Sequence, residues 1–428
     1  MDADSCSITT LLSVGRAVPS TLWHQPAFVT LWAGQSVSAL GSMMTLVAFP
    51  LTAVLVLDAS PEQMGVLAAC RTAPVLVLGL LAGAWVDRLR RRPLMIASDL
   101  GRAVALASIP VAGALGWLRL EQLYVVAAAV GALTVIFDVA YQAYLPTLIR
   151  RGELVAGNSA LETSSSAAEV VGPAMAGALV QAIAPLWTLL FDAATFLVSA
   201  GSLALIRTRE PAPRPSGTRP GLWPEVRQGL AFVARDPRLR ALTGCSATRS
   251  LFGGFFEALY VVFASRDLGL PAALVGLLVG LGGVGALLGA AATGRITDRV
   301  GSGRTLVGAA LLAGGLNLLV PVAALPGAPA PALLGAAQLL GDGAAITYIV
   351  VAVSYRQTVT PDTLLGRTNA TVRSLTVGAQ LVGAVVGGLL AVVFGTALAL
   401  LIAAVGVLLA PAWLVLSPVP ALETAAPD

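Results

Sequence analysis

The residues of this sequence that can do chemistry are carboxylates and arginines embedded in long apolar stretches. Placing an ionisable group in such surroundings is costly, so each one is a hypothesis for a functional site. The group comprises Arg71, Asp99, Arg102, Asp138, Glu162, Glu169, Asp192, Arg249, Glu257, Asp342 and Arg373. Acids outnumber arginines in this group, which indicates that some acids hold a proton part of the time. The pattern therefore predicts proton binding and release.

Glu169 has the position of a proton carrier. It lies eleven residues after the start of a helix predicted over 158–183, about 16 Å along the axis and near the middle of a bilayer. A carboxyl group at that depth favours its neutral form, because charge is poorly solvated there. Glu162 lies seven residues earlier on the same face and is a second candidate. The segment from Ser159 to Glu162 also has the spacing of a capping box at a helix start.

Asp138 and Asp342 are the other candidate proton carriers, each within an apolar run. A further set of polar residues in these runs is interpreted as lining a substrate cavity. This set is Gln35, Ser38, Arg71, Arg249 and Glu257. The arginines favour an anionic group on the substrate, and salt bridges among these charges explain them equally well. Asp99 and Arg102 are three residues apart on one helical face, so we expect them to pair with each other.

Composition identifies the apolar stretches as membrane spans. The chain is 57% hydrophobic and only 11% charged, where a soluble domain carries about 25% charge, and its mean hydropathy is +0.85. One histidine and three cysteines predict neither a metal site nor a disulfide framework. All 26 basic residues are arginine, so the lysine-containing phosphate loop of ATP-binding proteins is absent. We therefore expect no cofactor and a proton gradient as the energy source.

A helix needs roughly 20 apolar residues to cross a bilayer, and runs bounded by charge or proline predict twelve such helices. The predicted spans are 27–57, 63–86, 93–116, 121–145, 158–183, 186–206, 240–265, 270–293, 304–325, 330–355, 368–394 and 397–417. The first 26 residues lack the pattern of a removable signal peptide.

The spans divide into two groups of six. We predict an N-terminal tail (1–26), a six-helix bundle (27–206), a linker (207–239), a second six-helix bundle (240–417) and a C-terminal tail (418–428). Proline and arginine make the start of the linker too polar to pack. Its second part, WPEVRQGLAFVARDP, has apolar residues at helical spacing and predicts an amphipathic helix at the membrane surface.

The loops alternate in arginine content, which predicts the orientation of the chain. Four arginines crowd into positions 88–92, and others follow the fourth, sixth, eighth and tenth spans. The loops on the opposite side hold only Arg119 and Arg266. Because positively charged loops remain in the cytoplasm, we expect both termini to be cytoplasmic.

Residues of the first half recur in the second half at an offset of 211 positions, which indicates a duplicated six-helix unit. The motif of Gly83, Asp87 and Arg88 recurs as Gly294, Asp298 and Arg299. Tyr144, Asn158, Gly172 and Gly177 recur as Tyr355, Asn369, Gly383 and Gly388. The pair Gly172 and Pro173 predicts a helix break, and the other glycines predict close helix packing. A glycine run over 276–289 predicts sliding of that helix against the one over 158–183.

Several stretches resemble the major facilitator superfamily. GAWVDRLRRRPL resembles the loop signature of that superfamily. FDVAYQAYLPTLI, GPAMAG, LFDAATFLVSA and RQTVTPDTLLGRTNA resemble its efflux branch, which includes macrolide exporters and enterobactin-type siderophore exporters. The resemblance covers 27–415. It implies an all-α integral membrane fold of twelve transmembrane helices in two pseudo-symmetric six-helix bundles.

The resemblance also implies a cytoplasmic gate. Its residues would be Gly83, Asp87, Arg88, Arg91, Gly294, Asp298 and Arg299. Asp87 would meet the positive end of a helix that starts near Asn369, and Asp298 would meet one that starts near Asn158. Arg91 and its neighbours have a second interpretation, in which they hold the loop in the cytoplasm and bind lipid phosphates. By the same resemblance, Asp192 lies on a peripheral helix and is interpreted as a packing or gate residue.

Together these features predict a secondary transporter of the bacterial inner membrane, not an enzyme, that works by alternating access. We expect an antiporter that exports an amphipathic drug, secondary metabolite or siderophore in exchange for protons. An importer on the same fold is the first alternative, and a sensor or scaffold without transport activity is the second. The expected partners are a small-molecule substrate and membrane lipid, without nucleic acid, and the expected state is a monomer.

Overall fold

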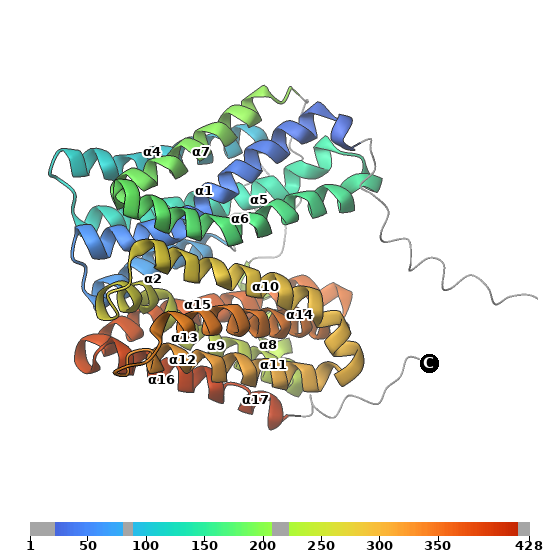
Figure 1. The fold of residues 1–428 in the computed structure, drawn as a ribbon. Coiled ribbons are helices and arrows are strands. Elements are labelled where there is room, and N and C mark those ends of the chain that lie inside the picture. Colours follow the sequence, from blue (N-terminus) through green and yellow to red (C-terminus); the bar gives the residue numbers. More distant parts are fainter. Residues whose placement is uncertain (1–21, 80–88, 208–221, 418–428) are drawn as a thin grey trace, which may run out of the picture.

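The computed structural model describes residues 22–79, 89–207 and 222–417. Gly83, Asp87 and Arg88, the first copy of the predicted gate motif, lie outside the described residues. The described chain is almost entirely helical and forms two bundles that lie side by side (Figure 1). The helices from α1 to α7 build the first bundle, and those from α9 to α17 build the second.

Three of the six long helices of the first bundle begin with a proline, whose fixed φ suits the first helical turn. The six are α1 (Pro26–Val56), α2 (Pro61–Leu78), α4 (Arg91–Ala114), α5 (Leu120–Leu148), α6 (Leu154–Ile183) and α7 (Pro185–Leu205). Single 3₁₀ turns, η2 (Leu22–His24) and η3 (Arg151–Glu153), precede α1 and α6.

The second bundle contains more irregular helices. Its long regular members are α9 (Pro237–Val262), α10 (Ala272–Val300), α11 (Ser302–Asn317), α14 (Asp342–Val359), α15 (Asp362–Phe394) and α16 (Thr396–Leu409). Short pieces extend them: η4 (Phe263–Asp267), α12 (Leu319–Val322), α13 (Ala330–Ala336), η5 (Ala337–Gly341) and α17 (Ala412–Val415). Both η4 and η5 are π-helical. The amphipathic helix α8 (Leu222–Arg235) packs on α9 and α15.

The predicted all-α membrane fold is confirmed. Ten spans among the described residues are long and apolar enough to cross a bilayer. The two further predicted spans correspond to α2, described as far as Leu78, and to α9, whose arginines lower its mean hydropathy. Each remaining span corresponds to one long helix or to consecutive pieces of one.

Three predicted helix boundaries are wrong. The helix α6 begins at Leu154, so Ser159 and Glu162 lie inside it and form no capping box. The helix α15 begins at Asp362, before the predicted start near Asn369. The helix α10 continues to Val300, so the second copy of the gate motif lies on its last turns. In α10 and α15 the helix extends through charged residues beyond the apolar run, because a helix does not have to end where the bilayer does.

The internal repeat appears in the contacts that join the two bundles. A Cβ added at Gly177 of α6 would lie 2.9 Å from the Cα of Gly276 on α10. At positions related by the 211-residue offset, a Cβ added at Gly388 of α15 would lie 3.2 Å from the Cα of Gly65 on α2. Two equivalent glycine seams, α6 with α10 and α2 with α15, therefore hold the bundles together.

Gly172 and Gly383 make a second pair of equivalent contacts, here within each bundle. A Cβ at Gly172 would lie 3.2 Å from the carbonyl oxygen of Leu40 on α1. A Cβ at Gly383 would overlap the carbonyl of Leu251 on α9, the residue related to Leu40 by the repeat. The predicted break at Pro173 is wrong, because α6 continues to Ile183 with that proline inside it.

Candidate functional site

A cavity of about 1090 Å³ lies between the two bundles. The first bundle contributes residues of α1, α2, α5 and α7 to its wall, and the second contributes residues of α9, α14 and α15 among others. Most of this wall is apolar, and the ionisable side chains are few. Those that line it are Arg71, Asp138, Asp192, Glu257, Asp342 and Arg373. Such a cavity suits an amphipathic molecule, whose apolar body meets the wall while its polar groups meet these charges.

One end of the molecule is held closed by contacts between the bundles. Arg266, in η4 of the second bundle, donates hydrogen bonds to Asp58 Oδ1 at 2.5 Å, to the Ala59 carbonyl at 3.1 Å and to the Val54 carbonyl at 3.3 Å. The Ala273 amide also donates to Gln181 Oε1 at 3.2 Å. We call this end the Arg266 end.

The opposite end carries both ends of the described chain, at Leu22 and Ser417, and is called the terminal end (Figure 1). Towards it the cavity wall extends as far as Gln142 and Asn369. Asp298 is exposed there and forms no hydrogen bond or ion pair with any described residue. Its predicted contact with the helix start near Asn158 is therefore absent from this conformation, as expected where the gate is open.

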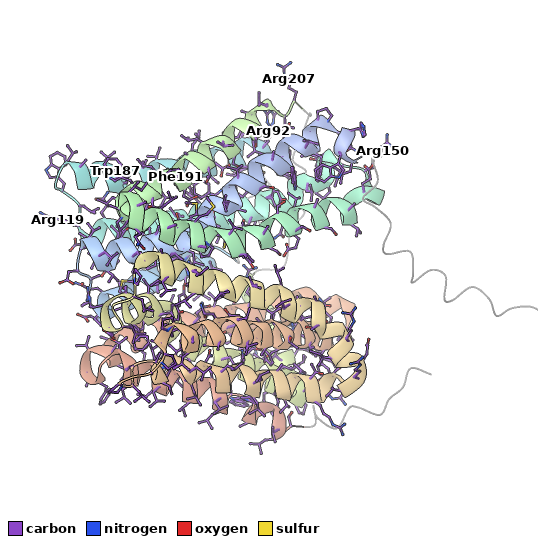
Figure 2. All side chains as sticks on the ribbon, viewed as in Figure 1. Arg92, Arg119, Arg150, Trp187, Phe191 and Arg207 are labelled. Carbon is purple, nitrogen blue, oxygen red and sulfur yellow. The ribbon has the colours of Figure 1, made fainter. Side chains whose placement is uncertain are left out.

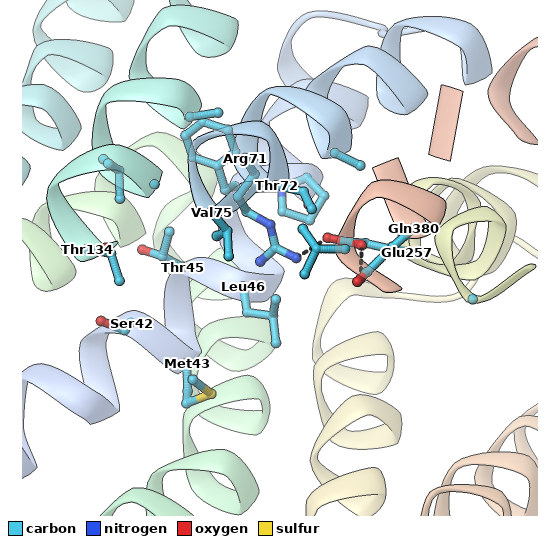
Figure 3. Close-up of a pocket in the computed structure, with 18 of the residues that line it drawn as sticks. Ser42, Met43, Thr45, Leu46, Arg71, Thr72, Val75, Thr134, Glu257 and Gln380 are labelled. Atoms are coloured by element: carbon cyan, nitrogen blue, oxygen red, sulfur yellow. Dashed lines mark hydrogen bonds and ion pairs between the residues drawn. The ribbon is translucent and has the colours of Figure 1, made fainter. Parts of the chain in front are cut away.

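An ion pair joins the bundles across the cavity. Arg71 Nη2 on α2 donates to Glu257 Oε1 on α9, and Gln380 Nε2 on α15 donates to the second carboxylate oxygen, Oε2, at 2.6 Å (Figure 3). The Arg71 side chain is 46% exposed and that of Glu257 only 16%. Of the two interpretations left open for these charges, the structure shows the pairing in this conformation. Exposure leaves the guanidinium accessible to a substrate.

Asp138 and Asp192 provide the negative charge on the first-bundle side of the cavity. Asp138 on α5 lies within electrostatic range of Arg373 on α15, across the cavity. Asp192 on α7 is buried at the wall and accepts a hydrogen bond from Thr195 Oγ1 at 3.1 Å. The sequence interpretation of Asp192 as a packing or gate residue did not include its place in the cavity wall.

Behind this wall lies a buried pair formed by Asp99 and Arg102, as the three-residue spacing predicted. The Arg102 guanidinium lies over the rings of Phe137 and Phe196, with 4.5 and 4.1 Å between Cζ and the ring centroids. Its positive charge is within electrostatic range of Asp138 and Asp192 as well. Two aromatic faces and one carboxylate thus fix a cation next to the acids of the cavity.

Five of the predicted proton carriers and cavity residues lie away from the cavity wall: Gln35, Ser38, Glu162, Glu169 and Arg249. Glu162 is exposed on α6. Glu169 is exposed on α6, and its backbone contacts Gly283 of α10. Gln35 donates to Ser199 Oγ at 2.9 Å inside the first bundle, and Ser38 is buried nearby. Arg249 lies over the ring of Tyr348, with its Cζ 4.7 Å from the centroid.

Arg91 and Arg92 hold helix ends together. Arg91 Nη1 donates to the carbonyl of Ala143 at 3.0 Å, near the end of α5. Arg92 donates to the carbonyls of Leu203 and Ala204 at the end of α7. Cations at helix C-termini stabilise the exposed carbonyls and the helix dipole. These contacts give the two arginines a role in joining helix ends that the sequence did not predict.

Arginines are found at both ends of the first bundle. Arg92, Arg150 and Arg207 lie at the terminal end, and Arg119 lies at the other (Figure 2). Trp187 and Phe191 on α7 are exposed at the outer surface of the first bundle, where apolar side chains contact lipid.

The fold and the cavity define the chain as a membrane transporter of the major facilitator superfamily. The model of the family described as "Transmembrane secretion effector" matches residues 19–428, so the chain belongs to that family. It is therefore a transporter and not an enzyme.

Two relatives cover most of the chain. The multidrug efflux pump Tap of Mycolicibacterium fortuitum is 29% identical over 378 residues, which cover 86% of this chain and 89% of Tap. The uncharacterised transporter YfiS of Bacillus subtilis is 28% identical over 394 residues, which cover 89% of this chain and 90% of YfiS.

Solved structures share the fold. A bacterial homologue of the iron transporter ferroportin in its inward-facing state has a TM-score of 0.72 at 20% identity, covering 91% of this chain and 98% of its own. The nucleoside transporter NupG has a TM-score of 0.75 at 12% identity, covering 91% and 98%.

Proposed function

We propose that this transporter exports an amphipathic small molecule from the cytoplasm in exchange for protons, by alternating access. The family description as a secretion effector and the similarity to the efflux pump Tap support the direction. The large, mostly apolar cavity supports the amphipathic character of the substrate.

The observation that supports proton coupling is the excess of acids over arginines in the cavity wall. Among the described residues that line the cavity, Asp138, Asp192, Glu257 and Asp342 face two arginines, Arg71 and Arg373. Excess carboxylates in a cavity with apolar walls repel one another and are poorly solvated, so they bind protons more readily than exposed ones. A site of this kind can take up a proton on one side of the membrane and release it on the other.

Asp138 is the favoured carrier among the acids of the first bundle, because protonation would act directly on the bundle contact. When Asp138 is charged, it attracts Arg373 of the second bundle across the cavity. A proton on Asp138 would remove that attraction and shift the equilibrium between the two conformations. Glu169, Glu162 and Asp342 are the other proposed carriers.

The proposed gate acts at the terminal end, which we assign to the cytoplasm because it carries most of the arginines. In the opposite conformation, Gly294, Asp298 and Arg299 on α10 would approach the start of α6. Gly83, Asp87 and Arg88, with Arg91, would form the equivalent contact with α15. Each contact to a helix N-terminus contributes about 1 kcal/mol. Opening the other end requires the hydrogen bonds of Arg266 to break.

We further propose that the chain lies in a bacterial inner membrane as a monomer, that membrane lipid is its only other partner, and that it needs no cofactor. Retention of amphipathic antibiotics and siderophores in expressing cells tests the proposed export, with empty-vector cells as the control. Export predicts lower retention in expressing cells, and an uncoupler should abolish the difference. Higher retention in expressing cells would establish import instead.

A further inference from the structure

A cluster of polar side chains on the second-bundle side of the cavity has no hydrogen-bond or ion-pair partner among the described residues. Asp342, Gln338, Asn317 and Tyr260 all line the cavity. None of the four side chains forms a hydrogen bond or ion pair with a residue in the described ranges. The Tyr260 side chain is 9% exposed, and its buried hydroxyl has no hydrogen-bond partner among the described residues. Polar groups that face a cavity without a protein partner are available for hydrogen bonds with a ligand.

The four side chains lie close together. Gly282 of α10 lies beside two of them. A Cβ added at Gly282 would overlap the Asp342 carboxylate and lie 3.7 Å from Gln338 Nε2. A Cβ added at Gly341 would lie 3.8 Å from Asn317 Oδ1. The Tyr260 hydroxyl is within electrostatic range of the Asp342 carboxylate. The cluster therefore offers one carboxylate, two amides and one phenol around a common space.

Irregular backbone brings these residues together. Gln338 lies within the π-helical segment η5, and Asp342 follows it directly. Asn317 is the last residue of α11, where that helix gives way to α12. Tyr260 comes three residues before the π-helical segment η4. Single π-helical turns within α-helices occur frequently at functional sites, because they re-aim side chains at a cost in regular hydrogen bonding.

The negative charge of Asp342 indicates which chemical group of a ligand the cluster would bind. Glu257 pairs with Arg71, Asp138 faces Arg373, and Asp192 lies near Arg102. Asp342 has no such basic partner in the part of the chain that the structure describes. A protonated amine supplies both the missing positive charge and up to three N–H donors, which the carboxylate and the amide and phenol oxygens can accept. A neutral hydroxyl would leave the charge unbalanced.

We propose that Asp342, Gln338, Asn317 and Tyr260 form a subsite that binds the protonated amine of an amphipathic substrate. Gly282 supports this subsite, because any larger residue there would displace the carboxylate. The inference rests on the proposed export through this cavity and adds the substrate class to it. The ammonium group and a proton would then compete for Asp342.

Binding to purified protein tests the subsite. Daunorubicin, which carries a primary amine, is compared with N-acetyl-daunorubicin, which is neutral, by fluorescence anisotropy in detergent. We expect the wild type to bind the amine about tenfold more tightly, and Asp342→Asn to remove this difference by weakening the amine alone. Tyr260→Phe should reduce the difference about threefold, and Glu121→Gln, at the start of α5 outside the cavity wall, should preserve it.

Equal affinity for both probes in the wild type, including failure to bind either, would overturn the subsite. An undiminished preference for the amine in Asp342→Asn would overturn it too. Gly282→Ala provides a second test if Asp342→Asn does not fold, because it displaces the carboxylate without removing it; an unchanged preference in this variant also counts against the subsite. The binding assay is made in detergent without a proton gradient and does not depend on the direction of transport. A negative result in it is therefore distinguishable from a failure of proton-coupled export.

Discussion

Arg71 of α2 and Glu257 of α9 form an ion pair that joins the two bundles across the substrate cavity. Gln380 of α15 donates to the same carboxylate, so three helices meet at this point (Figure 3). A substrate that enters the cavity meets this pair, and a polar group on the substrate can replace either partner. We propose that the pair connects substrate binding with the contact between the bundles.

Removing one partner should disturb transport more than removing both. We expect Arg71→Gln and Glu257→Gln each to slow transport, because each leaves an uncompensated charge at the wall. The double variant should recover part of the loss, with a coupling of about 1 kcal/mol, or roughly fivefold, as for a partly exposed pair. Initial transport rates in vesicles measure this double-mutant cycle. Purely additive losses would show that the pair does not act as a unit.

Arg266→Gln should shift the protein towards a conformation open at the Arg266 end. The substitution removes the charge that holds Asp58 and weakens the bonds to the carbonyls of Val54 and Ala59. A partly exposed charged contact of this kind contributes about 1 kcal/mol, so the population should shift about fivefold. The labelling rate of a cysteine placed at Ala59, whose side chain is buried at this end, reports the opening. Arg119→Gln, at the same end of the molecule, is the control that should leave the labelling rate unchanged.

Gly177→Ala should destabilise the protein and impair transport, because its Cβ would lie 2.9 Å from the Cα of Gly276 across the seam. Overpacking of this kind costs about 1–3 kcal/mol. The matched control is Gly201→Ala in α7, where a Cβ meets no atom within 4 Å. The control should be neutral or slightly stabilising, because alanine favours a helix. Thermal unfolding midpoints in detergent compare the two, and equal midpoints would contradict close packing at the seam.

Arg102→Met should lower stability strongly, by about 3 kcal/mol, because it leaves Asp99 buried without its partner. Adding Asp99→Asn should restore part of this stability, since both side chains of the former pair, at positions 99 and 102, are then neutral. Unfolding in denaturant measures both variants. Arg119→Gln, exposed at the Arg266 end, serves as the control for loss of an arginine.

The sequence predicted the features that depend on charge and repetition. Long apolar runs located the helices, and the 211-residue offset predicted the equivalence that Gly177 and Gly388 show at the two seams. The cost of burying charge drew attention to Arg71, Glu257, Asp138 and Asp342, all of which line the cavity.

What the sequence could not predict is the face that each helix turns towards the cavity. Gln35 was assigned by its polarity within an apolar run and Glu169 by its depth, and neither property distinguishes the cavity from the bundle interior or the outer face of a helix. Gln338 and Tyr260 were missed because a neutral polar residue in an apolar run gives a weaker signal than a charge. The π-helical segments that contain Gln338 and follow Tyr260 depend on backbone geometry that hydrophobic patterning does not contain.

Substrate-driven proton movement tests the central claim most directly. Inside-out vesicles with a preset pH gradient would hold the wild type, Asp138→Asn, Glu169→Gln or the control Glu121→Gln, and the gradient would be followed as antibiotics and siderophores are added. The account predicts that a transported compound dissipates the gradient in the wild type and in Glu121→Gln, and does not dissipate it in Asp138→Asn, which lacks the favoured carrier. Substrate movement without any change in the gradient would contradict proton-coupled export.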